Sequence, residues 1–159
     1  NPTSHIGTFP LPESQLDRFL MRISLGFPGQ ALERELLRGN DRREMIAETA
    51  PVLKTEQLLA LQKLVPGVHV SPALLDYLQA LVLHTRQLPQ LAPGMSPRAA
   101  IALMRAAQAW AMIHGERAVL PEHVQAVFPG VAMHRMAVTD YSASPDEQAR
   151  AIIEAVAIP

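Results

Sequence analysis

Apolar residues recur every three or four positions through most of this chain, which is the spacing of helices that bury one face. The clearest case predicts a helix over residues 98–114, with Gly115 placed to end it. Ser96 is a favoured N-cap, and Pro97 fits the first helical position, where its missing N–H costs nothing. The expected buried face consists of Ala100, Leu103, Ala107, Ala111 and His114.

The same spacing, with start and stop signals, predicts several more helices. We expect them at residues 13–19, 30–39, 55–64, 73–87, 121–128 and from Ser144 onward, with a short helix and a loop in 40–53. Pro129-Gly130 is expected to end the helix over 121–128. The apolar stripe of the helix over 73–87 is Leu74, Leu75, Leu78, Leu81 and Val82.

One stretch alternates with a period of two instead. Residues 21–27 place apolar side chains at every second position, as a strand with one buried face does, and Pro28-Gly29 stops it. Two very short β segments, 68–70 and 118–120, each lead directly into a helix that starts with proline. We expect these two segments to pair as a small ribbon in a mainly helical fold.

Composition sets the size and character of the core. The 159 residues suffice for one domain, or for a domain and a piece of another, and the first residue is Asn1 rather than Met, as in a cut from a longer protein. Hydrophobic residues make up 48% and charged residues 18%, which suits a folded soluble protein. Aromatic residues are only 4%, so the core must consist of Leu, Ala, Val, Ile and Met.

Several classes of function find no support. The net charge of −1 and the lack of a basic helix argue against a DNA-binding domain. Cysteine is absent, and none of the six histidines are three or four residues apart, so we expect neither thiolate chemistry nor a metal site. No apolar run approaches the about 20 residues of a membrane span. Neither a G-x-S-x-G motif nor a G-x-x-x-x-G-K-[ST] phosphate loop is present.

Arg98 fits its predicted position poorly. It falls in the first turn of a helix, where the helix dipole favours an anion and disfavours a cation. One reading is a solvated surface arginine, because exposed charges are common. The other is that Arg98 and the helix N-terminus together hold an anion such as a nucleotide phosphate.

The beginning of the chain resembles a known family. Asn1-Pro2, four residues, and then GTFPLPESQLDRF resemble the segment from sensor 1 to the arginine finger in the MoxR branch of the AAA+ ATPases. SPALLDYL, HTRQLPQL and GMSPRAAIALMRAAQAWAMIHGERAVLPEHV are similar to the family's lid and sensor 2 helix, and MHRM and IIEAVAIP to its C-terminal pieces. The sequence departs from the family pattern at His84 and at Pro93-Gly94-Met95. The Walker A and Walker B segments, which lie upstream in the family, are not in the chain.

The resemblance implies a mainly α fold. It would be a helical bundle, the AAA+ lid, with a small remnant of the α/β nucleotide-binding core and the short β-ribbon. Residues 1–28 would form the C-terminal edge of the core, with sensor 1, the arginine finger and the last strand. Residues 29–159 would form the helical lid with sensor 2.

The resemblance also assigns roles to single residues. Asn1 matches the sensor 1 residue, which would orient the attacking water, and Arg18 matches the arginine finger, which would act on the neighbouring subunit's ATP. Arg98 matches sensor 2 and would contact the bound nucleotide. The alternatives are a turn asparagine at Asn1, an ion pair of Arg18 with Asp17 or Glu13, and the solvated Arg98 described above. Arg86 and Arg135 also match family positions, and we interpret them as structural pairs or interface residues.

The implied function is that of a motor. The complete protein would hydrolyse ATP with Mg²⁺ in a cytoplasmic ring, expected to be a hexamer, without nucleic acid or a membrane span. It would remodel or mature partner complexes, with a von Willebrand A-type protein or another client as partner. Without the Walker segments, we expect the chain alone to be inactive and to bind no nucleotide tightly. The alternative is a non-catalytic helical interaction module, and the upstream sequence distinguishes the two.

Overall fold

The computed structural model describes residues 11–39, 42–91, 93–136 and 143–158, and Asn1 lies outside them. Two compact units divide the chain: one holds the residues up to Arg22 and those from Leu64 onward, and the other is Ile23–Lys63. Regular secondary structure in the described residues is helical. The mainly α fold expected from the sequence is therefore confirmed.

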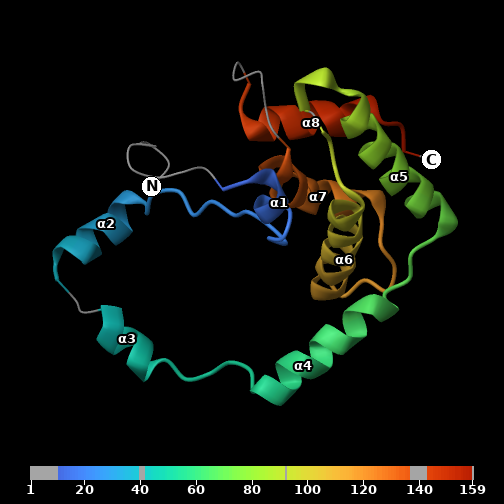
Figure 1. Cartoon of the computed structure of the whole chain (residues 1–159). Helices are drawn as coiled ribbons and strands as arrows, with labels where there is room; N and C mark the ends of the chain where they lie inside the picture. Colours follow the sequence, from blue (N-terminus) through green and yellow to red (C-terminus); the bar gives the residue numbers. More distant parts are fainter. Residues whose placement is uncertain (1–10, 40–41, 92, 137–142, 159) are drawn as a thin grey trace. The chain divides into compact units, whose positions relative to one another are not determined.

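The larger unit is a bundle built around two helices, α6 (Pro97–Ile113) and α7 (Pro121–Ala132), which pack on each other (Figure 1). Helix α8 (Pro145–Ala155) packs on α7, and α5 (Pro72–Gln87) contacts α6, α7 and α8. Shorter pieces complete the unit: α1 (Glu13–Leu16) and the 3₁₀ turns η1 (Val65–Gly67), η2 (Pro89–Leu91) and η3 (Met133–Arg135).

The core of this unit combines small residues on α6 with large ones on its neighbours. Ala99, Ala107 and Ala111 of α6 are fully buried, which lets α7 approach closely. Tyr77 and Phe128 are the bulkiest side chains in the interior. Each such apolar side chain contributes about 1.5–3 kcal/mol when it leaves water, so burial dominates the stability of the bundle.

Three helices begin with a serine followed by proline, as the sequence indicates. The side-chain oxygens of Ser71, Ser96 and Ser144 accept hydrogen bonds from the backbone N–H groups three residues later, at 3.1, 3.0 and 3.3 Å. Each bond satisfies one of the donors that a helix start leaves without an intrahelical partner. At α8 the carboxylate of Glu147 also accepts from the Ser144 N–H at 2.7 Å and completes a capping box.

The smaller unit holds α2 (Gln30–Leu37), α3 (Arg42–Glu48) and all but the last residue of α4 (Thr55–Leu64). These bounds match the helices expected from the sequence to within two residues. Every side chain that the structure describes in this unit is exposed. The apolar stripes of its helices are therefore not buried against another described element.

Two expectations about β structure need correction. No strand forms over residues 21–27, because no neighbouring strand in the described part of the chain pairs with it. The Arg22 N–H instead donates to the Gly130 carbonyl at 2.8 Å. The expected ribbon is a single parallel bridge between His69 and Ala118, with hydrogen bonds of 3.0 and 2.8 Å.

The predicted end of the helix over residues 121–128 was wrong. Helix α7 continues through Pro129 and Gly130 to Ala132. The proline removes one backbone donor. Val127, Phe128, Val131 and Ala132 on either side of it are almost fully buried, and their packing outweighs that loss.

The buried faces of α5 and α6 are close to those expected, with a few exceptions. Leu103, Ala107 and Ala111 are buried, whereas Ala100 is half-buried and His114 is exposed at the end of α6. Leu75 of α5 is 45% exposed, in contrast to the other members of its stripe.

Candidate functional site

Arg135 holds the segment that follows α1. It lies in η3, directly after α7, and its side chain is only 3% exposed. Its two terminal nitrogens donate to the carbonyls of Val131, at 2.6 Å, and Phe19. Its Nε lies 3.3 Å from Asp17 Oδ1 in an ion pair that lacks hydrogen-bond alignment. This one guanidinium therefore connects α7 to two positions, Asp17 and Phe19, that flank Arg18.

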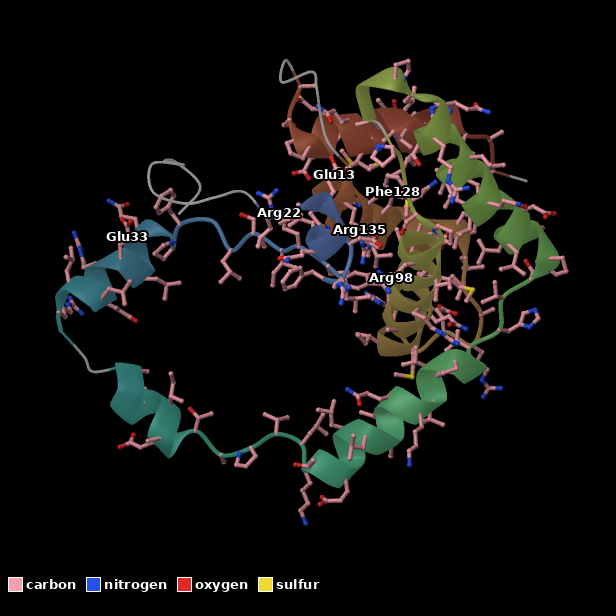
Figure 2. The ribbon with its side chains drawn as sticks, in the orientation of Figure 1. Glu13, Arg22, Glu33, Arg98, Phe128 and Arg135 are labelled. Atoms are coloured by element: carbon pink, nitrogen blue, oxygen red, sulfur yellow. The ribbon has the colours of Figure 1, made fainter. Side chains whose placement is uncertain are left out.

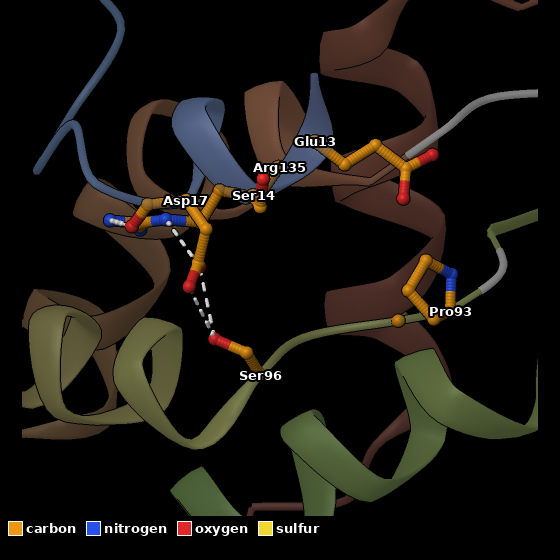
Figure 3. Close-up of a pocket in the computed structure, with 7 residues that line it drawn as sticks. Glu13, Ser14, Asp17, Pro93, Ser96 and Arg135 are labelled. Carbon is orange, nitrogen blue, oxygen red and sulfur yellow. Dashed lines mark hydrogen bonds and ion pairs between the residues drawn. The ribbon is translucent and has the colours of Figure 1, made fainter.

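Asp17 is the link between that segment and α6. Its carboxylate accepts a hydrogen bond from the Ser96 hydroxyl, with oxygen distances of 2.9 and 3.0 Å (Figure 3). Ser96 is at the same time the N-cap of α6, because its oxygen accepts from the Ala99 N–H. The chain of contacts from Arg135 through Asp17 to Ser96 joins η3, α1 and the start of α6.

His134 makes a second connection to the same segment. Its Nδ1 lies 3.0 Å from the Gly130 carbonyl and its Nε2 lies 3.1 Å from the Phe19 carbonyl. Burial lowers the pKa of His134, and the neighbouring Arg135 lowers it further, although the two carbonyls act in the opposite direction. A neutral imidazole has one N–H, so it donates to only one of these carbonyls.

The two arginines that the sequence singled out are both exposed. Neither the Arg18 nor the Arg98 side chain makes a hydrogen bond or an ion pair within the described residues. Arg98 lies in the first turn of α6, near enough to Arg135 that its charge lowers the pKa of that guanidinium, after the larger effect of burial (Figure 2). Asp17, which was the expected partner of a structural Arg18, pairs with Arg135 instead.

The loop before α6 is fixed from the other side by α5. The Arg86 Nε donates to the Met95 carbonyl at 2.9 Å, and the Met95 N–H donates to the buried Thr85 hydroxyl oxygen at 3.1 Å. Arg86 is thus a structural residue, as interpreted from the sequence. The start of α6, and with it the backbone of Arg98, is held in place by both α5 and Asp17.

A hollow of about 200 Å³ opens between α1 and the loop before α6 (Figure 3). Glu13, Asp17, Ser96 and Arg135 line it, and Asp17 contacts both Ser96 and Arg135. Arg18 and Arg98 do not line it. The hollow is therefore a feature of the network around Asp17 and not a place where Arg18 and Arg98 converge.

Sequence reasoning missed the residues that organise this site. Asp17 was considered only as a partner for Arg18, Ser96 only as a helix cap, and His134 only as one of six histidines without metal-ligand spacing. The acid in Leu16-Asp17-Arg18-Phe19 was the available signal, but its partner Ser96 is 79 positions away. The described residues contain no group of three His, Cys, Asp or Glu side chains suited to a metal ion. None of the described helices has the length and apolar character that crossing a membrane requires.

The chain is similar in sequence to a known protein family and to several known proteins. Residues 83–156 match the family described as the AAA lid domain. The chain is 36% identical over 156 residues to the uncharacterized protein YeaC of Bacillus subtilis, covering 98% of this chain and 49% of that protein. It is also 36% identical over 177 residues to Chaperone MoxR1 of Mycobacterium tuberculosis, covering 100% of this chain and 45% of that protein.

A solved structure has a similar fold over the whole chain. The fold matches a candidate ATPase from Cytophaga hutchinsonii with a TM-score of 0.85 and 29% identity, over 100% of this chain and 52% of that one. The chain thus spans about half the length of each of these relatives.

Proposed function

The chain belongs to the MoxR family of AAA+ ATPases, and we propose that it is the part of such an ATPase that senses bound nucleotide and acts on the neighbouring subunit. Arg98 would serve as sensor 2 and Arg18 as the arginine finger. Asn1, which lies outside the described residues, would serve as the sensor 1 residue.

The observation that carries this proposal is the state of the two arginines. Arg18 and Arg98 are exposed and without polar side-chain partners in the described residues, while the backbone beside each is held by Asp17, Phe19 and Ser96. A planar, permanently charged guanidinium on a fixed backbone suits contact with phosphate oxygens. A cation in the first turn of a helix is unfavourable unless an anion offsets it, which fits the position of Arg98.

The residues present fit the phosphates of ATP better than they fit its metal. Both free arginines suit an anionic ligand, whereas the described residues hold no cluster of acidic side chains for Mg²⁺. We propose that the complete protein binds Mg²⁺ together with ATP. When bound, ATP supplies the phosphoanhydride whose hydrolysis would drive the protein.

The proposed biological role follows from the relatives. One of them is named a chaperone, and we propose that the complete protein uses ATP to remodel or mature partner protein complexes. A finger that acts on the neighbouring site requires a ring, for which a hexamer is the proposed form. A von Willebrand A-type partner and a cytoplasmic location stay predictions.

The test compares the complete protein with the 159-residue chain. We expect the complete protein to form rings and hydrolyse ATP, and the chain alone to fold as a helical unit without turnover, measured by phosphate release and circular dichroism. Turnover that copurifies with the chain alone would contradict the proposal. A complete protein that binds no ATP would favour the alternative, a non-catalytic helical interaction module.

A further inference from the structure

We propose that Asp17 couples Arg18 to Arg98, so that the nucleotide sensed by one subunit at Arg98 sets how that subunit presents Arg18 to its neighbour. This inference rests on the proposed function and adds a route within one subunit. The route consists of the Asp17 carboxylate and the Ser96 hydroxyl. Asp17, Ser96 and Arg135 are positioning residues in it and touch no reacting atom.

The two residues that form the route lie next to the two arginines in the sequence. Asp17 directly precedes Arg18, and Ser96 stands two residues before Arg98. The only polar side-chain contact needed between them is the hydrogen bond from the Ser96 hydroxyl to the Asp17 carboxylate, at 2.9 Å. A shift of the first turn of α6 is therefore transmitted towards the backbone of Arg18 through the short Asp17 side chain, which Arg135 also contacts.

Arg135 makes the finger end of this route rigid. Its guanidinium contacts the Asp17 carboxylate on one side of Arg18 and the Phe19 carbonyl on the other. Because Arg135 is nearly fully buried, its charge needs Asp17 as a counter-ion. Within the described residues, Asp17 is thus held by Arg135 of η3 on one side and by the Ser96 hydroxyl at the start of α6 on the other.

The negative charge of a bound phosphate would change the strength of the hydrogen bond between Ser96 and Asp17. The Asp17 carboxylate, through Ser96, lies at the N-terminal end of α6, where the helix dipole is positive. A phosphate held by Arg98 would lie at this same end. Two anions at one helix end repel each other, so a bound phosphate weakens the bond between Asp17 and Ser96, and loss of the phosphate restores it. The strength of this bond therefore reports the nucleotide state.

The chain offers a matched control for testing this bond. Ser71 is the N-cap of α5, is also followed by proline, and accepts from the Leu74 N–H at 3.1 Å. Its hydroxyl has no carboxylate partner in the described structure. Ser96→Ala removes both a cap and the link to Asp17, whereas Ser71→Ala removes a cap only. Ser96→Thr keeps the hydroxyl and should behave as the unchanged protein.

The experiment uses rings of the complete protein in which two kinds of subunit are mixed. One kind carries an inactivated Walker motif together with Ser96→Ala, Ser71→Ala, Ser96→Thr or Arg18→Ala, and the other kind is unchanged. All turnover then comes from the ATP sites of unchanged subunits. Some of these sites lie next to a variant subunit, which supplies their Arg18. We expect Ser96→Ala to lower kcat at those neighbouring sites about tenfold, the scale of one hydrogen bond to a charged group, with KM little changed. Ser71→Ala and Ser96→Thr should leave kcat within about twofold, as expected for changes that keep the link.

Each outcome decides between the two proposals. If Arg18→Ala stops turnover at the neighbouring sites and Ser96→Ala matches Ser71→Ala, the coupling through Asp17 is wrong and the finger stands. If Arg18→Ala has no effect in verified mixed rings, the proposed function itself fails. If Ser96→Ala lowers turnover only when it is placed in subunits that keep an intact Walker motif, and not in the Walker-inactive subunits, its role is local to α6 and the coupling is overturned.

Discussion

Gly94 lies directly against the backbone of Arg86. A β-carbon at Gly94 would stand 2.7 Å from the Arg86 Cα and 2.8 Å from its nitrogen, closer than side chains tolerate. Gly94 also has a φ of +76°, in the left-handed region that favours glycine. This contact brings the loop before α6 close enough to α5 for the Arg86 side chain to reach the Met95 carbonyl. The position of Arg98 thus depends on a glycine four residues before it.

The first prediction is that Gly94→Ala strongly destabilises the chain. The new methyl group combines left-handed backbone strain with a clash against backbone, and we expect a loss of about 2–4 kcal/mol in the free energy of unfolding. Gly115→Ala is the control, because Gly115 has a φ of +78° but open space around it. It should lose only about 1 kcal/mol. Equal losses in denaturant titrations would show that the contact with Arg86 is unimportant.

Local signals in the sequence were sufficient for where the helices of the bundle begin, but not for every end: the helix expected over residues 13–19 ends at Leu16. The serine caps before Pro72, Pro97 and Pro145 have their partners within three residues, so each helix start was readable from a short window. Of the buried alanines of α6, Ala107 and Ala111 followed from spacing, whereas Ala99 and Ala106 were not predicted. These features depend on interactions that are close in sequence.

Features that depend on residues distant in the sequence could not be predicted from local sequence signals. A strand over residues 21–27 needs a neighbouring strand, and the described chain contains none for it. Pro129 was taken as a helix stop because its tolerance depends on the tertiary packing of Phe128 and Val131. The bond between Asp17 and Ser96 joins residues 79 positions apart. The roles of Asn1, Arg18 and Arg98, and the domain boundary after residue 28, stay predictions.

The second prediction concerns how His134 changes the stability of the chain at low pH. Burial lowers the pKa of folded His134 below its ordinary value of 6.5, so between these two pKa values the unfolded chain binds more protons than the folded one. The stability contributed by neutral His134 is present above about pH 6.5 and decreases as the pH falls towards the folded pKa. We expect His134→Gln, which cannot titrate, to lose less stability than the unchanged chain between about pH 7 and pH 5.

Thermal unfolding of both proteins across this range measures the difference, and the other histidines cancel in the comparison. The lowered pKa of His134 would be wrong if the unchanged chain became more stable than the variant on acidification. That result would mean that the imidazolium donates to the Gly130 and Phe19 carbonyls at once and that this outweighs burial.

The third prediction concerns Arg98 in the complete protein. Arg98→Ala should weaken ATP binding about tenfold, because a charge-assisted contact to phosphate is lost, and should uncouple bound ATP from the position of the lid. The fold should persist, since removing a cation from the first turn changes helix stability by at most about 1 kcal/mol. Arg105→Ala is the control: Arg105 is exposed on the same helix, outside the first turn, and contacts only Gln108 in the described structure.

Titration with a fluorescent nucleotide and thermal unfolding separate the two possible roles of Arg98. Unchanged ATP affinity in a variant that unfolds readily would make Arg98 a structural residue. Equal weakening by Arg105→Ala would show a general effect of surface charge and not a specific contact.

The fourth prediction concerns Arg18 and chemistry in the complete ring. The charge that a finger stabilises grows towards the transition state, so Arg18 should affect turnover more than binding. Arg18→Ala should lower kcat about 10³-fold or more, with ATP affinity little changed. Arg18→Lys should rescue poorly, because an ammonium lacks the planar fork of the guanidinium. A variant that lost ATP affinity and kept its kcat would contradict this role.

Mixed rings then decide whether Arg18 acts on the neighbouring site. Arg135 contacts the backbone carbonyls of Asp17 and Phe19 on both sides of Arg18, and the exposed Arg18 side chain has no hydrogen-bond partner of its own among the described residues. Subunits with intact Walker motifs and Arg18→Ala should therefore regain turnover when they assemble with Walker-inactive subunits that keep Arg18. Phosphate release at several mixing ratios should rise to a maximum at intermediate composition, because neither kind of subunit is active alone. Verified mixed rings without any recovery would show that Arg18 does not act across the interface.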